Sequence, residues 1–231
     1  MISFLSKYKR SIFIVVVVVF IGSIFFISGQ IFSAASSDAV ADVGGKKIPY
    51  QRFSLQVGRV LDSMRSSGTD VSDVVAKTVK QDVFREMIIE ELFSQQADKL
   101  NITVPDFEVA VEIQNTPQFT EGGAFNPRLY YQTIYNEFRM APKEYESWRK
   151  KARLSSKFKQ FMFTNIKVTP MELQTYYLTK NKTLKDFDKD KAKYQDELYQ
   201  AKFSQVANYL LRQLTAQVEI KSYLDQREQG K

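Results

Sequence analysis

The pattern of apolar and polar positions divides the chain into one long apolar stretch and a series of shorter, periodic segments. Residues 11–29 read "SIFIVVVVVFIGSIFFISG" and contain no charged side chain. A helix needs about 20 such residues to cross the hydrocarbon core of a bilayer. We therefore expect a transmembrane signal anchor at 11–29, preceded by a cytoplasmic N-terminus at 1–10 and followed by a tether at 30–38.

The charges around this stretch predict its orientation. Lys7, Lys9 and Arg10 lie just before it, and the next basic residue is Lys46. Because positive charge is retained on the cytoplasmic side, everything after Gln30 is expected outside the cytoplasm.

A cleaved signal peptide is the competing interpretation of the same residues. The segment "SAASS" provides small side chains at Ser33 and Ala35, as a cleavage site requires. The apolar region of a signal peptide is usually only about 7 to 15 residues long, however. The length of the apolar stretch therefore favours the uncleaved anchor.

A short β-hairpin is predicted directly after the tether. Val40 and Val43 precede the pair Gly44–Gly45, and Ile48 follows it. Two consecutive glycines permit the positive φ angles that a tight hairpin turn requires.

From Pro49 onward the apolar spacing is helical. Prolines mark the helix starts, because a proline at the first helical position loses no hydrogen bond. Thr169 and Glu172 also form a capping box. Helices are predicted to begin at Pro49, Val71, Pro105, Pro127, Pro142, Pro170 and Phe187, the last running to residue 216.

We therefore expect a mainly α protein with a small β-hairpin and a bundle of about seven helices, in one domain at 39–231. The alternation in "AQVEIKSYL" is compatible with a further short strand at Val218–Tyr223. Whether the helices close into a compact bundle or leave an open cradle is not decided, because periodicity identifies a buried face without saying what covers it.

Composition removes most catalytic chemistry. The chain contains no cysteine and no histidine. Disulfides, thiolate nucleophiles, imidazole ligands and the usual acid/base group at neutral pH are therefore excluded. We expect a protein that is not an enzyme and that holds no metal or cofactor.

Charge places the exported part among mildly basic proteins. Three of the 33 Lys and Arg residues and none of the 26 Asp and Glu residues lie in 1–29, which leaves a net charge of +4 for the remainder. This balance falls short of the strong basic bias of nucleic-acid binders, so no nucleic-acid partner is expected.

Two acidic clusters are interpreted as solvated helix faces. They are Glu90–Glu91 and the segment "DFDKDKAKYQDE" at 186–197. Lysines at helical spacing accompany the acids, and no glycine-rich ion-binding loop is present.

A basic cluster lies on the helix that Pro142 begins. It either binds anionic headgroups or acidic partner segments, or it is an exposed face whose aliphatic stems cover the edge of the core. The second interpretation is favoured. The cluster consists of Arg149, Lys150, Lys151, Arg153, Lys157 and Lys159.

The segment "NTPQFTEGGAFNPRLYY" combines aromatic residues with a Gly–Gly pair and two prolines. Its phenylalanines either form a mobile contact surface or attach the loop to the bundle. Our candidate residues for contacting apolar polypeptide segments are Phe119, Phe125, Tyr130, Tyr131 and Trp148.

The order of these features resembles a known family. The signal anchor is followed by "VADVGGKKIPYQRF", "FREMIIEELFSQQADKLNITVPDFEVAVEI", "FTEGGAFNPRLYYQTIYNEFRMAPKEYESWRKKARL" and "NIKVTPMELQTYY". This order is similar to the N-terminal chaperone region of the SurA and PpiD group of periplasmic folding factors, and most similar to the membrane-anchored PpiD type. The likeness covers about residues 11–177 and returns for the last helix.

In that family the segment matching "VTPMELQTYY" leads into a parvulin-type peptidyl-prolyl isomerase domain. Here only "LTKNKTLKD" at 178–186 separates Tyr177 from Phe187, which is too short for a domain of about 50 residues. The family's pocket is also lined with histidines, which this chain lacks. Isomerase activity is therefore not expected.

The resemblance implies a chaperone in the inner membrane whose C-terminal domain lies in the periplasm. It would hold unfolded exported or outer-membrane proteins by aromatic and apolar contacts, with the translocation machinery as a further candidate partner. The alternative is an envelope scaffold subunit that binds one folded partner through its last helix or its basic face.

Overall fold

The computed structural model describes residues 38–181 and 183–229. The predicted anchor at 11–29, the N-terminus at 1–10 and all but the last residue of the tether lie outside these residues. Within the described ranges, no helix combines the length and the apolar character needed to cross a membrane.

A three-stranded antiparallel sheet joins the two ends of the described chain. Strands β1 (Ala39–Val43) and β2 (Lys46–Pro49) form the predicted hairpin, and Gly44 and Gly45 take φ angles of 60° and 82° at its turn. Strand β5 (Ile220–Ser222) pairs with the other edge of β1, in the order β2-β1-β5. The sequence left a strand at 218–223 as one possibility; the structure has it as β5, which completes the sheet.

Eight α-helices are present in the described residues, one more than the sequence predicts. The additional helix, α9, is only five residues long and follows β5, where no proline or cap marks its start. The eight are α2 (Tyr50–Ser66), α3 (Asp73–Lys99), α4 (Asp106–Gln114), α5 (Pro127–Thr133), α6 (Pro142–Thr164), α7 (Pro170–Lys180), α8 (Phe187–Gln217) and α9 (Leu224–Glu228).

Local rules account for most helix boundaries. Pro127, Pro142 and Pro170 are at the first helical position as expected. Pro49 and Pro105 instead lie one residue earlier, as extended N-caps with ψ of 136° and 150°. The fixed φ of proline suits either position, so the pattern alone misplaces these two starts by one residue.

The segments on either side of α5 have regular structure that the pattern did not predict. A 3-10 turn η1 (Pro117–Phe119) leads into a two-stranded hairpin, β3 (Thr120–Glu121) and β4 (Ala124–Phe125). After α5, the chain continues as a π-helical segment, η2 (Ile134–Phe138), and ends at Arg139 in the left-handed region.

The buried side chains form two clusters. One lies between the sheet and helices α2, α3, α6 and α8, and includes Phe53, Leu92 and Phe93. The other lies between α4, η1, α5, η2 and the start of α6, and includes Phe119, Ile134 and Phe138. The second cluster supports the candidate site described below.

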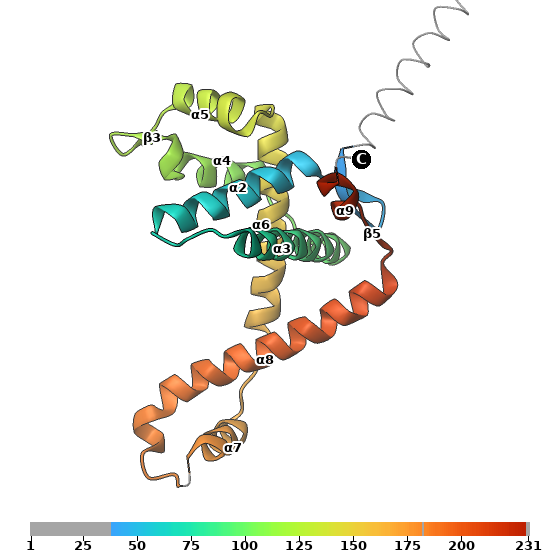
Figure 1. The fold of residues 1–231 in the computed structure, drawn as a ribbon. Coiled ribbons are helices and arrows are strands. Elements are labelled where there is room, and N and C mark those ends of the chain that lie inside the picture. The colour runs from blue at the N-terminus through green and yellow to red at the C-terminus, as the bar shows by residue number, and fades with distance from the viewer. Residues whose placement is uncertain (1–37, 182, 230–231) are drawn as a thin grey trace, which may run out of the picture.

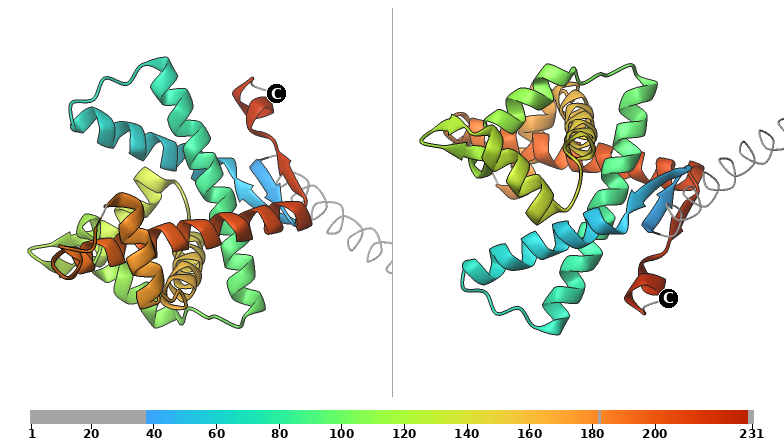
Figure 2. Two further views of the ribbon diagram at one scale, coloured as in Figure 1. Left: turned by 90° about the horizontal axis from the view of Figure 1, so that it is seen from below. Right: turned by 90° about the horizontal axis from the view of Figure 1, so that it is seen from above.

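The helices leave an open arrangement rather than one closed bundle. Helix α6 crosses α3, and α8 runs obliquely from α7 to the sheet, so that α7 and the first half of α8 project as an arm (Figure 1, Figure 2). Tyr177 holds the arm together, with its ring 4.8 Å from Tyr194 and 5.3 Å from Phe187. The connection between α7 and α8 begins after Lys180, three residues later than predicted.

Candidate functional site

A hollow of about 530 Å³ opens between α4, α5 and the first half of α6. Val109 and Ile113 of α4 form one wall, and Tyr130 and Tyr131 of α5 form the opposite wall. Charged residues surround this apolar interior. We call the hollow the aromatic pocket; it is lined by Asp106, Val109, Ala110, Ile113, Gln114, Phe125, Pro127, Tyr130, Tyr131, Lys143, Glu146, Ser147 and Lys150.

A local sequence motif positions the aromatic wall. Gly122 and Gly123 take φ angles of 60° and 83° and turn β3 back into β4, which places Phe125 before α5. The side chain of Asn126 then accepts a hydrogen bond from the Leu129 amide and caps α5. Because Tyr130 and Tyr131 follow within the first turns of this capped helix, their direction is set by the helix start.

Beneath the pocket the aromatic rings pack edge to face. The ring of Phe119 lies 5.1 Å from Tyr130 and 5.8 Å from Tyr145, nearly perpendicular to both. Phe138 lies a further 5.0 Å from Tyr145. Such pairs gain about 0.5–1.5 kcal/mol beyond simple burial. These closely packed rings therefore form the floor of the pocket.

The hydroxyl of Tyr130 links this wall to α6. It donates a hydrogen bond of 3.3 Å to Glu146. Burial, followed by the nearby charge of Glu146, raises the pKa of Tyr130. The tyrosine therefore stays protonated at neutral pH and acts as a donor, not as a base.

Three of the five candidate aromatic residues meet in the pocket. Phe125 is half-buried and Tyr130 is nearly buried, whereas Tyr131 keeps 51% of its surface exposed. Phe119 is fully buried below them, so its role is to support the wall rather than to touch a ligand. Trp148 lies outside this pocket and lines a second one.

The second hollow, of about 580 Å³, lies on the other side of the first turns of α6. We call it the Trp148 pocket; it is lined by Lys47, Pro49, Arg52, Met140, Ala141, Lys143, Glu144, Ser147, Trp148 and Lys151. Lys143 and Ser147 line both pockets, so this part of α6 forms a ridge between them.

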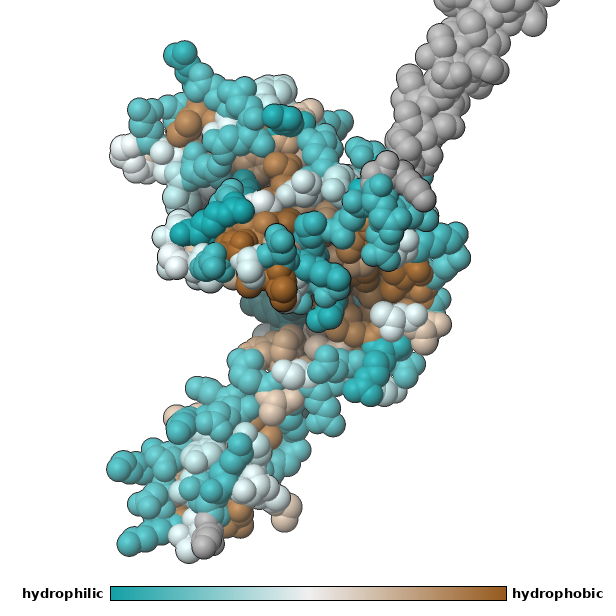
Figure 3. Space-filling view, viewed as in Figure 1, coloured by the Kyte–Doolittle hydropathy of each residue, from teal (hydrophilic) through white to brown (hydrophobic). Residues whose placement is uncertain are grey.

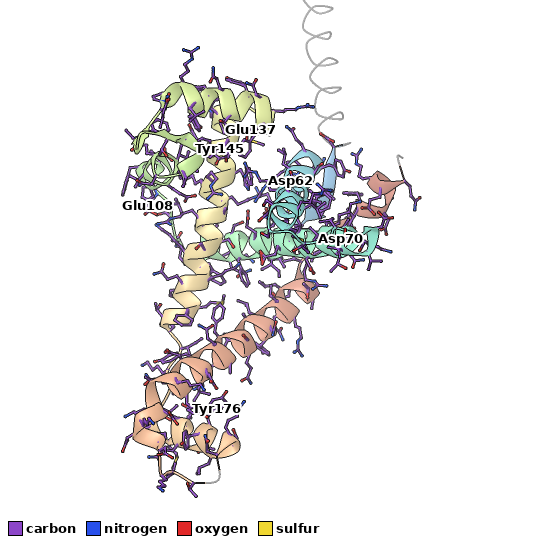
Figure 4. All side chains as sticks on the ribbon, turned by 60° about the vertical axis from the view of Figure 1, so that its left-hand side comes forward. Asp62, Asp70, Glu108, Glu137, Tyr145 and Tyr176 are labelled. Carbon is purple, nitrogen blue, oxygen red and sulfur yellow. The ribbon has the colours of Figure 1, made fainter. Side chains whose placement is uncertain are left out.

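The basic cluster of α6 is largely paired with carboxylates. Arg149 pairs with Glu112, Lys150 with Asp106, and both Arg153 and Lys157 with Glu108, all on α4; Lys151 pairs with Glu91 on α3. The Nζ of Lys159 lies 5.9 Å from the Phe93 ring. The pairs with Asp106, Glu108 and Glu112 attach α4 to α6 and thereby hold the aromatic pocket. Figure 4 labels Glu108 on α4, beside α6.

Glu90 and Glu91 are not a solvated face, contrary to the prediction. The side chain of Glu91 is only 3% exposed; it pairs with Lys151 and accepts a 2.9 Å hydrogen bond from Gln95. Glu90 pairs with Arg52 of α2. Both carboxylates meet cations from other helices, which spacing within their own helix cannot reveal.

The walls contributed by α4 were missed by the sequence-based selection. Val109, Ile113, Lys143 and Glu146 line the pocket but are not among the candidate residues chosen from the sequence. One signal was present: Glu108 and Glu112 of α4 are four residues apart, and so are Arg149, Arg153 and Lys157 of α6.

A third hollow, about 620 Å³, lies between α3, the end of α8 and β5. Phe84, Ile88 and Leu92 form one side, and Leu211 and Ile220 the other. The face shown in Figure 3 has apolar residues over the central body, whereas the α7 arm is mostly hydrophilic.

The described residues hold no group of three or more carboxylates placed to bind a metal ion. The arrangement instead offers apolar hollows rimmed by charge.

Two comparisons relate the chain to known proteins. The family model described as "SurA-like N-terminal domain" matches residues 1–159. The foldase protein PrsA of Caldanaerobacter subterraneus subsp. tengcongensis is 28% identical over 178 residues, covering 73% of this chain and 51% of that protein. The chain thus spans about half the length of this curated relative.

Proposed function

Because the chain belongs to the family of the SurA-like N-terminal domain, we propose that it is an extracytoplasmic chaperone that holds unfolded exported and outer-membrane proteins. The similarity to a protein named as a foldase supports the same class of function. In this role the protein binds a polypeptide and catalyses no reaction.

The aromatic pocket is the observation that carries this proposal. Tyr131 is half exposed above a floor in which Phe119 is fully buried, so the pocket presents apolar surface without depending on a bound partner for its shape. Aromatic side chains give a large contact area at little cost in conformational entropy. An apolar client side chain fits against Tyr131 and Phe125.

The charged rim favours weak and reversible contact. Asp106 and Lys150 are paired with each other across the pocket edge, so the rim carries both signs. An unfolded chain must lose conformational entropy at each contact, which keeps each one weak. Several such contacts along the open face delay aggregation while allowing release.

We propose that residues 11–29 anchor this chaperone in the inner membrane, with the described domain in the periplasm and the translocation machinery as a further partner. The uninterrupted apolar run and the basic residues before it support this proposal. Co-sedimentation of the full-length chain with membranes after alkaline washing tests it.

We propose further that the chain has no isomerase activity. Helices α7 and α8 pack directly against each other through Tyr177 and Tyr194, and the chain between them spans only residues 181–186. We expect no acceleration of a refolding reaction limited by proline isomerisation.

Site-specific cross-linking tests the contact surface. A photoreactive aromatic amino acid placed at position 131 is expected to cross-link to an unfolded outer-membrane protein. Position 135 on the next turn is the matched control, because Tyr135 is similarly exposed, at 56%, but does not line the pocket. Equal cross-linking at both positions would contradict the assignment.

The scaffold alternative draws support from α8. Val206 and Tyr209 keep 45% and 65% of their surfaces exposed on this helix. A pull-down from solubilised membranes discriminates: one stoichiometric folded partner favours a scaffold, and a heterogeneous set of exported proteins favours a chaperone.

A further inference from the structure

We propose that the Trp148 pocket binds an acidic side chain of an extended client segment, with a neighbouring apolar side chain against the indole ring. This inference rests on the proposed chaperone function and names the chemical class of segment that the second pocket selects. Charge, an unsatisfied donor and the position of the pocket beside the aromatic pocket support it.

The pocket collects positive charge from three elements. Lys47 comes from β2, Arg52 from α2, and Lys143 and Lys151 from α6, whereas Glu144 is the only carboxylate in the lining. The negative charges of Glu90 and Glu91 offset the positive charges of Arg52 and Lys151. Lys47 and Lys143 have no ion-pair partner among the described residues, so they are available to an incoming carboxylate.

Arg52 contacts Trp148 and Glu90 and keeps one donor unused. Its guanidinium carbon lies 4.9 Å from the centre of the Trp148 ring, and Glu90 accepts from one of its terminal nitrogens. Its Nε–H is buried and has no acceptor among the described residues. Burial lowers the pKa of Arg52, but a guanidinium remains charged at neutral pH. A small rotation of this side chain presents that donor to a carboxylate, the acceptor class that arginine prefers.

The apolar part of the pocket distinguishes a peptide from a lipid surface. Met140 and Trp148 form a recessed apolar wall between the cations. A membrane headgroup layer meets cations on an open face, whereas a peptide places an acidic side chain and an apolar side chain in the same hollow. The chemistry therefore fits an acidic, partly apolar polypeptide segment.

Because Lys143 and Ser147 line both hollows, one extended segment is able to cross the α6 ridge. Its apolar side chain enters the aromatic pocket while its acidic side chain meets Lys47 and Arg52. The two pockets together would then select segments in which acidic and apolar residues alternate.

Tryptophan fluorescence provides a direct test, since Trp148 is the only tryptophan in the chain. The full-length chain in zwitterionic nanodiscs is titrated with a short synthetic peptide of alternating glutamate and leucine. A matched peptide carries glutamine in place of each glutamate. We expect a saturable emission change with the acidic peptide, and about tenfold weaker binding of the glutamine peptide.

Substitutions in β2 locate the effect. Lys47→Gln is expected to weaken binding of the acidic peptide about threefold to tenfold. Lys46→Gln is the matched control, because Lys46 is the exposed neighbour that does not line the pocket. Rising salt concentration should weaken binding to the wild-type chain more than to Lys47→Gln.

Equal affinity for the two peptides, or equal effects of the two lysine substitutions, would overturn the proposal. An emission change with anionic vesicles but not with the acidic peptide would also overturn it, in favour of a lipid site. Suppression of client aggregation is measured in parallel on the same proteins. If Trp148 does not respond while aggregation is still suppressed, the pocket assignment fails and the chaperone function stands.

Discussion

Lys157 of α6 reaches Glu108 of α4 with an Nζ to Oε1 distance of 2.6 Å, and it also donates to the carbonyl oxygen of Thr103. This contact holds the start of α4 against α6, and Glu108 is directly followed by Val109, which lines the aromatic pocket. The shape of the proposed binding surface therefore depends on an ion pair between two helices. Predictions about pH follow directly from it.

Stability should depend on pH through Glu108. The hydrogen bond from Lys157, aided by Arg153, lowers the pKa of Glu108, so its carboxylate stabilises the fold above the unfolded-state pKa of about 4.3. This contribution is lost as the pH falls through the lower pKa of the folded state. Thermal melts should show Glu108→Gln less stable than wild type at pH 7, with the gap closing below about pH 4.

The comparison for that measurement is Glu86→Gln. Glu86 is exposed and has no ion pair among the described residues. A gap for Glu108→Gln that stays constant down to pH 3 would refute the role of the contact.

Replacing Lys151 should cost far more stability than replacing its neighbour Lys150. Lys151→Met leaves the buried carboxylate of Glu91 without its cation. We expect the free energy of unfolding to fall by about 2–4 kcal/mol. This is less than the loss for a fully buried ion pair, because the Lys151 side chain is one-third exposed to solvent. Lys150→Met breaks an exposed pair and should change urea unfolding little.

Adding Glu91→Leu to Lys151→Met should recover part of the lost stability, because the unpaired buried charge is removed. Similar losses for the two single lysine variants would contradict this account of Glu91.

The α7 arm should loosen when its cap is removed. The Thr169 side chain accepts from the Glu172 amide, and Glu172 accepts in turn from the Thr169 amide and from Lys202 of α8. These contacts lower the pKa of Glu172 to about 2. Thr169→Ala should destabilise α7 by about 1 kcal/mol, which raises amide exchange in that helix about fivefold.

Thr175→Ala serves as the comparison, since Thr175 is exposed on the same helix and makes no side-chain hydrogen bond within the described residues. Exchange that is equally fast in both variants would show that the cap contributes nothing.

Substitutions of Phe119 and Tyr131 should distinguish a residue that supports the fold from one that contacts the client. Phe119→Ala removes a fully buried ring and should cost about 3–5 kcal/mol of stability. Tyr131→Ala removes a half-exposed ring and should change stability by less than about 0.5 kcal/mol. Urea unfolding followed by circular dichroism checks both values, and a large loss for Tyr131→Ala would mean that it supports the fold.

Features set by neighbouring residues could be predicted from the sequence. The capping box at Thr169, the cap at Asn126 and the turn at Gly44–Gly45 depend on a few consecutive residues, and the structure has all three. The hydroxyl, amide and glycine chemistry that makes these contacts is visible in the sequence itself.

Features set by distant residues could not be predicted. The burial of Glu91 requires Lys151, which lies 60 positions later, and the third strand of the sheet requires β5 to return to β1. The same limit applies to the candidate site, because Phe119 and Tyr131 belong to one aromatic segment and only the packing of η1 and α5 separates a buried support from an exposed contact. The five-residue helix α9 carries too few apolar positions to show a period.

Light scattering during dilution of an unfolded outer-membrane protein tests the central claim most directly. The full-length chain in nanodiscs should delay aggregation at stoichiometric amounts, relative to empty nanodiscs. Tyr131→Ala should shorten the delay at least twofold, while Tyr135→Ala should match the wild type. Aggregation that proceeds as fast with the wild-type chain as with empty nanodiscs would contradict the chaperone function.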